Sequence, residues 1–152
     1  MKKKIVFCGI RNRLETIILA QDLGYEILGY IDDDYFVGYE KYGLKIIGTY
    51  KDLMSDKSNI VTDIKDSVEF FPTKYFISSP DYLINETRLS IIDMLDASNV
   101  KVANLVNPTV KNLDRLNVQL GKGVSLDRLN RTDCNNVVVA SCSYFSCCGI
   151  CR

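Results

Sequence analysis

The first hundred residues alternate between short apolar runs, which are typical of buried strands, and segments with helical spacing. Residues 2–10 and 25–34 are two such runs. Between them, Leu14, Ile17 and Ile18 fall on one helical face. A strand, a helix and a second strand within about 30 residues form a βαβ unit. We therefore expect two parallel strands joined by a right-handed crossover.

Both ends of this helix carry local signals. Asn12 stands before it and Glu15 follows three residues later, which is the spacing of a capping box. Gly24 comes after the last turn, where glycine commonly ends a helix. The predicted boundaries therefore agree with the apolar spacing.

Beyond residue 34 the same alternation continues. Residues 55–70 are polar and weakly patterned, and we expect a loop or insertion there with room for a helix. The other expected elements are a strand around Lys45–Ile47, a helix from Tyr50, a strand at 74–80, a helix at 81–100 with Leu89, Ile92 and Leu95 among its apolar positions, and a strand at 101–108. This order predicts a small doubly wound α/β domain with a parallel sheet.

After Pro108 the helical spacing disappears, and residues recur at intervals of six. One series is mostly apolar, and a second series, four positions further along, is small or medium in size. The two series are Leu120, Leu126, Thr132, Val138, Tyr144 and Ile150, and Val124, Asn130, Asn136, Cys142 and Cys148. Hexapeptide periodicity of this kind predicts a β-helix, with the apolar residue inside and the smaller residue at the corner.

The composition excludes several kinds of partner. Nineteen basic and nineteen acidic residues give a formal net charge of zero, which argues against nucleic acid and anionic membranes. No stretch approaches the roughly 20 apolar residues of a membrane span. The apolar run near the amino terminus is too short for a signal-peptide core. We therefore expect a cytoplasmic protein with reduced cysteines.

The chain contains no histidine, which removes several chemistries at once. It has no histidine general base, no Ser–His or Cys–His pair and no histidine metal ligand. Acid–base work would have to fall to Asp, Glu, Lys, Tyr or Cys.

Several motifs together resemble a known family, the sugar O- and N-acetyltransferases of the sialic-acid and bacillosamine type. The motifs are KIVFCGIRNR, GYEILGYIDDD, GLKIIGTYKDL, KVANLVNPTV, LGKGVSL and NNVVVASCS. The resemblance covers nearly the whole chain. It implies a Rossmann-like domain at 1–106 that holds a UDP-linked sugar. It also implies a left-handed β-helix segment at 107–152, incomplete here, that binds acetyl-CoA and forms a homotrimer.

This chain departs from the family pattern in two places. The family's first loop is usually glycine-rich and often carries a histidine, whereas this loop has only Gly9. The family's catalytic base is a histidine early in the β-helix, and the hexad alignment puts Ser146 and Cys147 in its place. The catalytic residue therefore stays unassigned.

The loop after the first strand is the first candidate binding site, with Gly9, Ile10, Arg11 and Asn12. Backbone N–H groups at a helix start can cradle a phosphate, and a glycine permits close approach. Arg11 or Arg13 can add a charged contact to a diphosphate. The alternative is an ordinary strand-to-helix turn.

Two further candidates follow other strands. Asp32-Asp33-Asp34 end the second strand, and an acidic residue there resembles those that hold the uridine part, so we favour Asp32 and Asp33. The alternative is a solvated turn. Ser78 and Ser79 end the strand at 74–80 and could face a ligand across the sheet, or else cap the next helix.

Four cysteines close to the end of the chain have C-x4-C-C-x2-C spacing: Cys142, Cys147, Cys148 and Cys151. A metal site, a disulfide and a nucleophile are the chemical alternatives. In the hexad register, however, Cys142 and Cys148 both fill small corner positions. We therefore expect structural use and no metal.

The leading hypothesis is acetyl transfer from acetyl-CoA to a UDP-linked amino sugar. The alternative is a UDP-sugar-binding module with a vestigial β-helix and no turnover. A nicotinamide-dependent oxidoreductase is disfavoured because the glycine fingerprint is broken and no second catalytic domain follows.

Overall fold

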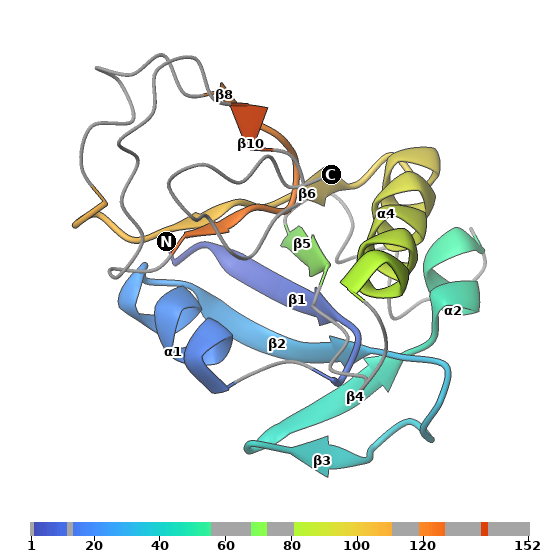
Figure 1. Ribbon diagram of the computed structural model, residues 1–152. Coiled ribbons are helices and arrows are strands. Elements are labelled where there is room, and N and C mark those ends of the chain that lie inside the picture. Colours follow the sequence, from blue (N-terminus) through green and yellow to red (C-terminus); the bar gives the residue numbers. More distant parts are fainter. Residues whose placement is uncertain are drawn as a thin grey trace.

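The sheet that the alternation predicts forms the centre of the molecule. The computed structural model describes residues 2–11, 14–55, 68–72, 81–110, 119–126 and 138–139 (Figure 1). Its main sheet has six strands in the order β3-β4-β2-β1-β5-β6, all parallel except the β3–β4 pair. Its elements are β1 (Lys4–Cys8), α1 (Leu14–Asp22), β2 (Glu26–Ile31), β3 (Glu40–Lys41), β4 (Leu44–Gly48), α2 (Tyr50–Met54), β5 (Val68–Pro72), α4 (Asp81–Ala97) and β6 (Lys101–Val102). A mixed α/β fold with a mainly parallel sheet is therefore confirmed.

The first βαβ unit has the expected parallel arrangement, because α1 joins β1 to β2 and these strands pair in parallel. The helix ends in a Schellman motif. The Tyr25 N–H donates to the Ala20 carbonyl at 3.0 Å, and the Gly24 N–H donates to the Gln21 carbonyl at 2.9 Å. Gly24 has a φ of +82°, so the predicted glycine stop is confirmed. Asn12, the predicted cap, lies outside the described residues.

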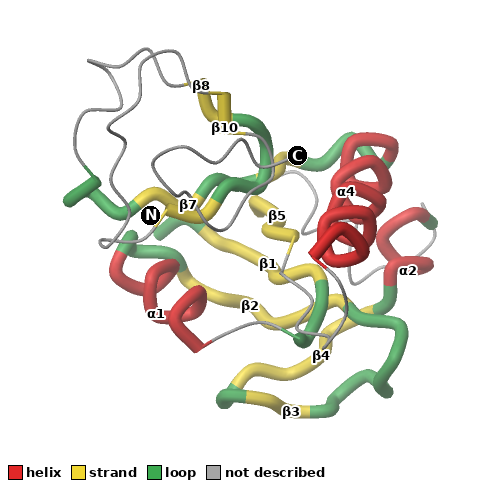
Figure 2. Tube along the Cα trace, in the orientation of Figure 1, coloured by secondary structure: helices red, strands yellow, loops and turns green. Residues whose placement is uncertain are grey.

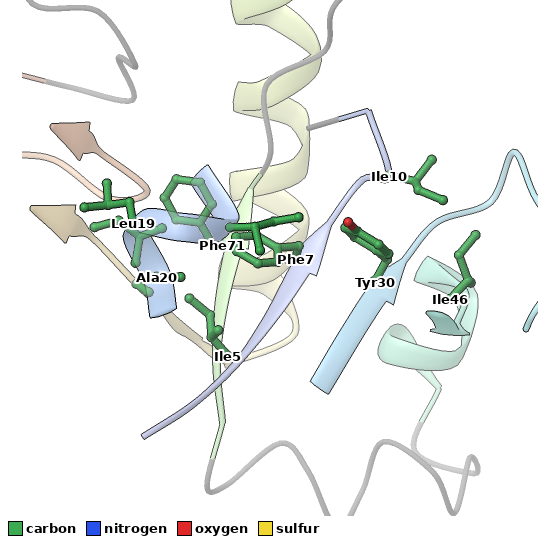
Figure 3. Close-up of a cluster of buried hydrophobic side chains, with 11 residues drawn as sticks. Ile5, Phe7, Ile10, Leu19, Ala20, Tyr30, Ile46 and Phe71 are labelled. Atoms are coloured by element: carbon green, nitrogen blue, oxygen red, sulfur yellow. The ribbon is translucent and has the colours of Figure 1, made fainter. Parts of the chain in front are cut away.

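Helices cover both faces of the sheet, because successive residues of β1 point to opposite sides. Ile5 and Phe7 pack in one cluster with the buried residues of α1, whereas Val6 and Cys8 pack with α2 and α4. Figure 3 shows the α1 side, where the Phe7 and Phe71 rings meet edge to face at 5.9 Å. Burial on both faces explains why these strands read as unbroken apolar runs.

The buried face of α1 differs from the predicted one. Ile17 is buried at 3% exposure, but Leu14 and Ile18 are 45% and 43% exposed. Leu19 and Ala20 are buried instead. The spacing correctly predicted a helix. It could not show which side of the helix packs against the sheet.

β5 corrects the expectation for residues 55–70. Val68–Pro72 form a strand directly beside β1, where a loop or insertion was expected. Val68, Phe70 and Phe71 are all buried. Residues 55–70 are polar and weakly patterned, but the Glu69 carboxylate has two partners, Tyr25 just before β2 and Lys101 on β6. The strand expected at 74–80 lies outside the described residues.

Those partners form a polar cluster at the amino-terminal side of the sheet. The Tyr25 hydroxyl donates to Glu69 Oε2 at 2.5 Å, and Lys101 Nζ lies 2.6 Å from Glu69 Oε1. Burial acts to raise the pKa of Glu69, but hydrogen bonds from Lys101 and Tyr25 and the charges of Lys101 and Lys3 lower it below its usual value. Burial, with the hydrogen bond to Glu69, raises the pKa of Tyr25.

α4 ends with Asn99 in the left-handed region, at a φ of +54°. Ile92 and Leu95 are buried as predicted, whereas Leu89 is 45% exposed.

In the part of the chain that the structure describes, no helix combines the length and the apolar content needed to cross a membrane.

The strand expected at 101–108 is split into two. β6 belongs to the main sheet, whereas β7 (Leu105–Val106) pairs in parallel with β9 (Ser125–Leu126). Asn104 makes the transition, because its side-chain amide donates to the Gly121 carbonyl at 2.8 Å and accepts the Val124 N–H at 2.9 Å. A single apolar run therefore serves two sheets.

The C-terminal strands are short parallel pairs. β7 pairs with β9 at a separation of 20 residues, and β8 (Gln119–Leu120) pairs with β10 (Val138–Val139) at a separation of 19. Leu120 lies opposite Val139 rather than Val138, so the strict hexad register is wrong by one residue in this ladder. An extra residue between paired strands shifts the register without abolishing the pairing. The β-helix, its handedness and the boundary at 106/107 stay predictions.

The β8–β9 turn packs closely on the main sheet. Gly123 has a φ of +70°, and a Cβ there would lie 2.6 Å from Pro72 Cγ. Val124 and Leu126 are fully buried, and Lys122 forms an exposed ion pair with Asp96 at 2.6 Å. Only glycine fits this turn without displacing β5.

Candidate functional site

The candidate site lies where β1 and β2 end. The strand order reverses at β1, because β2 and β4 lie on one side of it and β5 and β6 on the other. Open parallel sheets bind ligands beside the carboxyl ends of their strands at such a reversal. The predicted residues Gly9, Ile10, Arg11, Asp32 and Asp33 directly follow these two strands.

The first loop turns its backbone donors inward. The Gly9 N–H donates to the Ile31 carbonyl at 2.8 Å, and Gly9 has a φ of +107°. The Ile10 N–H donates to Asp32 Oδ2 at 2.8 Å. The Ile10 side chain is 2% exposed and packs with Tyr30 and Ile46 (Figure 3). Both donors, expected to cradle a phosphate, therefore serve the fold.

Asp32 links the ends of three strands. It is 1% exposed, the only buried charged residue in the described part of the chain. Its two carboxylate oxygens accept the Ile10 N–H at 2.8 Å and the Asp34 N–H at 2.7 Å. Its own N–H donates to the Gly48 carbonyl at 3.2 Å. Asp32 is thus placed to hold β1, β2 and β4 in register at the site.

Asp33 is exposed and lies at the start of α2. Its Oδ1 accepts the Tyr50 N–H at 2.9 Å, so the carboxylate meets the positive end of the helix. Thr49 and Asp52 complete the start of α2 as a capping box. The hydrogen bond from Tyr50 uses Oδ1, so the second carboxylate oxygen, Oδ2, can accept a hydrogen bond from a ligand.

Lys41 is a charged residue of the site that the sequence did not single out. Its Nζ donates to the Ile10 carbonyl at 3.1 Å, and its own carbonyl accepts the Tyr30 hydroxyl at 3.3 Å. The signal for this placement was the Tyr42-Gly43 turn, where both residues have positive φ and reverse the chain between β3 and β4. This hairpin carries Lys41 back to the first loop.

The structure brings some of the predicted site residues together and leaves others undescribed. Gly9, Ile10 and Asp32 form one hydrogen-bonded unit, and Asp33 follows it directly. Arg11 continues the first loop and is partly exposed. The predicted site residues outside the described ranges are Asn12, Ser78, Ser79, Ser146 and Cys147.

Cys8 is the cysteine that the structure describes. It is fully buried and not part of a disulfide, and burial raises the pKa of its thiol. A buried thiol with a raised pKa is a poor nucleophile and metal ligand. Among the described residues, no group of three or more His, Cys, Asp or Glu is placed to hold a metal ion. The C-terminal cysteine cluster lies outside these residues.

The fold defines an α/β protein with a mainly parallel sheet, and solved structures that match it include two kinds of acetyltransferase. The acetyltransferase domain of PglB from Neisseria gonorrhoeae FA1090, in complex with acetyl coenzyme A, has a TM-score of 0.62 and 18% identity. The match covers 93% of this chain and 60% of that one. A variant of perosamine N-acetyltransferase from Caulobacter crescentus, with CoA and GDP-perosamine, has a TM-score of 0.61 and 14% identity. That match covers 90% of this chain and 59% of the other.

These matches establish a shared fold. This chain spans about 60% of the length of the two proteins. No protein-family model matches the sequence, and no curated protein matches it. Both neighbours are acetyltransferases, and one of them holds a nucleotide sugar, GDP-perosamine; the sialic-acid type stays a prediction.

Proposed function

We propose that this chain binds a nucleotide-linked amino sugar at the carboxyl edge of its sheet and acts in the transfer of an acetyl group from acetyl-CoA to the sugar amine. The observation that carries the proposal is the fold match over 90% or more of the chain to enzymes whose structures hold CoA, acetyl-CoA or GDP-perosamine. The candidate site supports it, because its polar residues gather at the sheet edge where such folds bind ligands.

The two parts of the chain would divide this work. Residues 1–106 would form the Rossmann-like part that holds the nucleotide sugar, with a UDP-linked sugar as the first candidate. Residues 107–152 would contribute a left-handed β-helix segment that presents acetyl-CoA within a cytoplasmic homotrimer. The parallel pairs β7–β9 and β8–β10 support a coil that returns after about three hexads.

Within the site, each residue would have a separate task. Gly9, at a φ of +107°, would let the ligand approach the backbone closely. The Arg11 guanidinium would bind the diphosphate. Asp33 Oδ2 would accept a ribose hydroxyl, while Asp32 would hold the loop in place from below. Ser78 and Ser79 would face the ligand from the strand end that follows β5.

The chemistry constrains the acetyl-transfer step. The amine nitrogen attacks the thioester carbonyl carbon, a C–N bond forms, the C–S bond breaks, and CoA leaves as its thiolate, which takes up a proton. The ammonium proton must pass to a base or to water. With no histidine in the chain, Ser146 and Cys147 stand at the expected base position. A neutral amine is already a good nucleophile and needs no base before the attack.

The absence of histidine also favours a second function, sugar-nucleotide binding without turnover. The two functions differ in whether CoA is released. Both differ from a nicotinamide enzyme, because UDP or GDP rather than NAD should raise the melting temperature.

The test measures acetyl transfer and binding on the same protein. Purified chain would be mixed with acetyl-CoA and a UDP- or GDP-linked amino sugar, and released thiol would be followed with a thiol reagent. A matched sugar nucleotide whose amine is already acetylated is the substrate control. If thiol is released with the free-amine sugar but not with the acetylated control, acetyl transfer is supported. Binding of the nucleotide sugar without thiol release supports the binding module, and stabilisation by NAD alone would refute both.

A further inference from the structure

Three large aromatic side chains lie exposed on the loop between β2 and β3. Tyr35, Phe36 and Tyr39 are 37%, 72% and 36% exposed. Exposed aromatic rings that cluster together commonly mark a binding surface. We call these three residues the aromatic platform.

The platform is ordered before any ligand binds. The Tyr35 and Tyr39 rings stack at 4.8 Å between centroids, and the Phe36 ring meets Tyr39 edge to face at 5.7 Å. Backbone bonds fix the segment on β4, since the Gly38 N–H donates to the Ile46 carbonyl at 2.8 Å and the Ile46 N–H donates to the Tyr39 carbonyl at 2.9 Å. A preformed surface loses little entropy on binding.

The platform adjoins the candidate site. Tyr35 is two residues from Asp33, whose carboxylate lies at the start of α2. Lys41, on β3 just beyond this loop, donates to the Ile10 carbonyl of the first loop. Figure 2 shows this loop leading from β2 to the β3–β4 hairpin at one edge of the sheet. A ligand with its phosphates at the first loop would extend towards the platform.

We propose that the aromatic platform stacks the nucleobase of the bound nucleotide sugar, with Phe36 as the main contact. The inference rests on the proposed function and names the residues that recognise the base. Phe36 is the most exposed of the three rings, so its face is open to a planar ligand. Stacking accepts purines and pyrimidines alike, because every base has a π face.

The charges around the platform favour a base over an anionic surface. Asp33 and Asp34 precede it and Glu40 follows it, all exposed carboxylates. These groups repel anionic lipid headgroups. A base instead offers N–H donors, at N3 of uracil or at N1 and N2 of guanine, which exposed carboxylates beside the platform can accept.

The experiment separates the base from the diphosphate. Binding of UDP, GDP and inorganic pyrophosphate would be measured by calorimetry for the full chain and for Phe36→Ala, Phe36→Leu and Phe36→Trp. Leu89→Ala on α4 is the matched control, because Leu89 is an exposed apolar residue on another element. Phe36 is largely exposed, so its variants should fold, which melting curves would confirm.

We expect Phe36→Ala to raise the Kd of the preferred nucleotide by about tenfold, the size of one stacking contact. Phe36→Leu should lose most of this affinity, and Phe36→Trp should keep it. Pyrophosphate binding and the Leu89→Ala variant should not change. A comparison of the UDP and GDP values would identify the base.

The outcomes separate the two proposals. If the parent chain binds a nucleotide and Phe36→Ala binds it equally well, the platform has another role and the proposed function stands. If the parent chain binds neither UDP nor GDP, both proposals are wrong. If all variants lose pyrophosphate binding too, the effect is structural and the stacking role is refuted.

Discussion

Removing the carboxylate of Asp32 should separate the structural from the ligand-binding role of the sheet edge. Asp32 is 1% exposed, and its oxygens accept N–H groups from Ile10 and Asp34 at 2.8 Å and 2.7 Å. The Ile10 donor is buried, so in Asp32→Ala it would have no acceptor. The Asp34 donor is near solvent and can turn to water.

The magnitude follows from these two environments. A buried N–H left without an acceptor costs about 1–3 kcal/mol, and a hydrogen bond to a charged group contributes about 1.5–3 kcal/mol. We expect Asp32→Ala to lower the free energy of unfolding by about 2–4 kcal/mol in total. Asp32→Asn keeps one acceptor oxygen and should cost less, because only one of the two bonds is lost.

The matched control is Asp33→Ala, one residue along the chain. Asp33 is exposed and, among the described residues, accepts a single hydrogen bond, from the Tyr50 N–H at the start of α2, so its loss should cost about 0.5–1 kcal/mol. Urea denaturation of the variants would give the free energies. Hydrogen exchange would report directly on the Ile10 amide, which should be protected in the parent chain and in Asp33→Ala but not in Asp32→Ala.

Two results would refute this reasoning. Equal losses of stability in Asp32→Ala and Asp33→Ala would show that burial of the carboxylate is not what matters. Continued protection of the Ile10 amide in Asp32→Ala would show that another acceptor holds the first loop.

Three further predictions concern other parts of the fold. Gly29 has a φ of +145°, and a Cβ at this position would clash with the Lys45 carbonyl oxygen. Gly29→Ala should therefore lower the free energy of unfolding, measured in urea, by more than about 2 kcal/mol, and an unchanged midpoint would contradict this. Glu69 has a folded pKa below its unfolded value of about 4.3, so its contribution is full above that pH and is lost as the pH falls; Glu69→Gln should flatten the acid limb of a stability–pH curve, and a parallel curve would refute the assignment. The Cys8 thiol should resist alkylation in the native chain and react in urea, as peptide mass mapping would show; equal labelling in both would exclude its burial.

Local signals predicted the elements that are specified locally. The run before Gly9, the stop at Gly24 and the apolar positions Ile92 and Leu95 all gave correct elements, because each depends on its own stretch of chain. The sheet class followed from their order. The sequence singled out Asp32 and Asp33 as candidate site residues because acidic side chains directly follow a buried strand.

What the sequence could not predict depends on partners far along the chain. The polar, weakly patterned stretch 55–70 predicted a loop, whereas the partners that hold Glu69 in β5, Tyr25 and Lys101, are 44 and 32 residues away in sequence. The exposed face of α1 depended on where the sheet lay. The inward use of the Ile10 donor depended on Asp32, 22 residues later. Tertiary contacts, rather than the spacing of apolar residues, decide which face of an element is buried and which groups pair.

The inward direction of the Gly9 and Ile10 donors decides how an anion can bind at this edge. With those two N–H groups engaged, a diphosphate must be held largely by side-chain charge, and Arg11 is the charged residue that the structure describes between β1 and α1. Arg11→Gln should therefore weaken UDP, GDP and pyrophosphate by the same factor, about tenfold at low salt, and salt should weaken the parent chain more than the variant.

The same titrations distinguish this role from a general loss of positive charge. Lys45→Ala removes one exposed positive charge from the amino-terminal part of β4, outside the first loop, and should leave all three affinities within about twofold. Phe36→Ala should affect the nucleotides only, so the two variants divide the ligand into its phosphate and base. If Arg11→Gln binds pyrophosphate as the parent does, the diphosphate is held elsewhere. The first loop is then the ordinary strand-to-helix turn that its single glycine also allows.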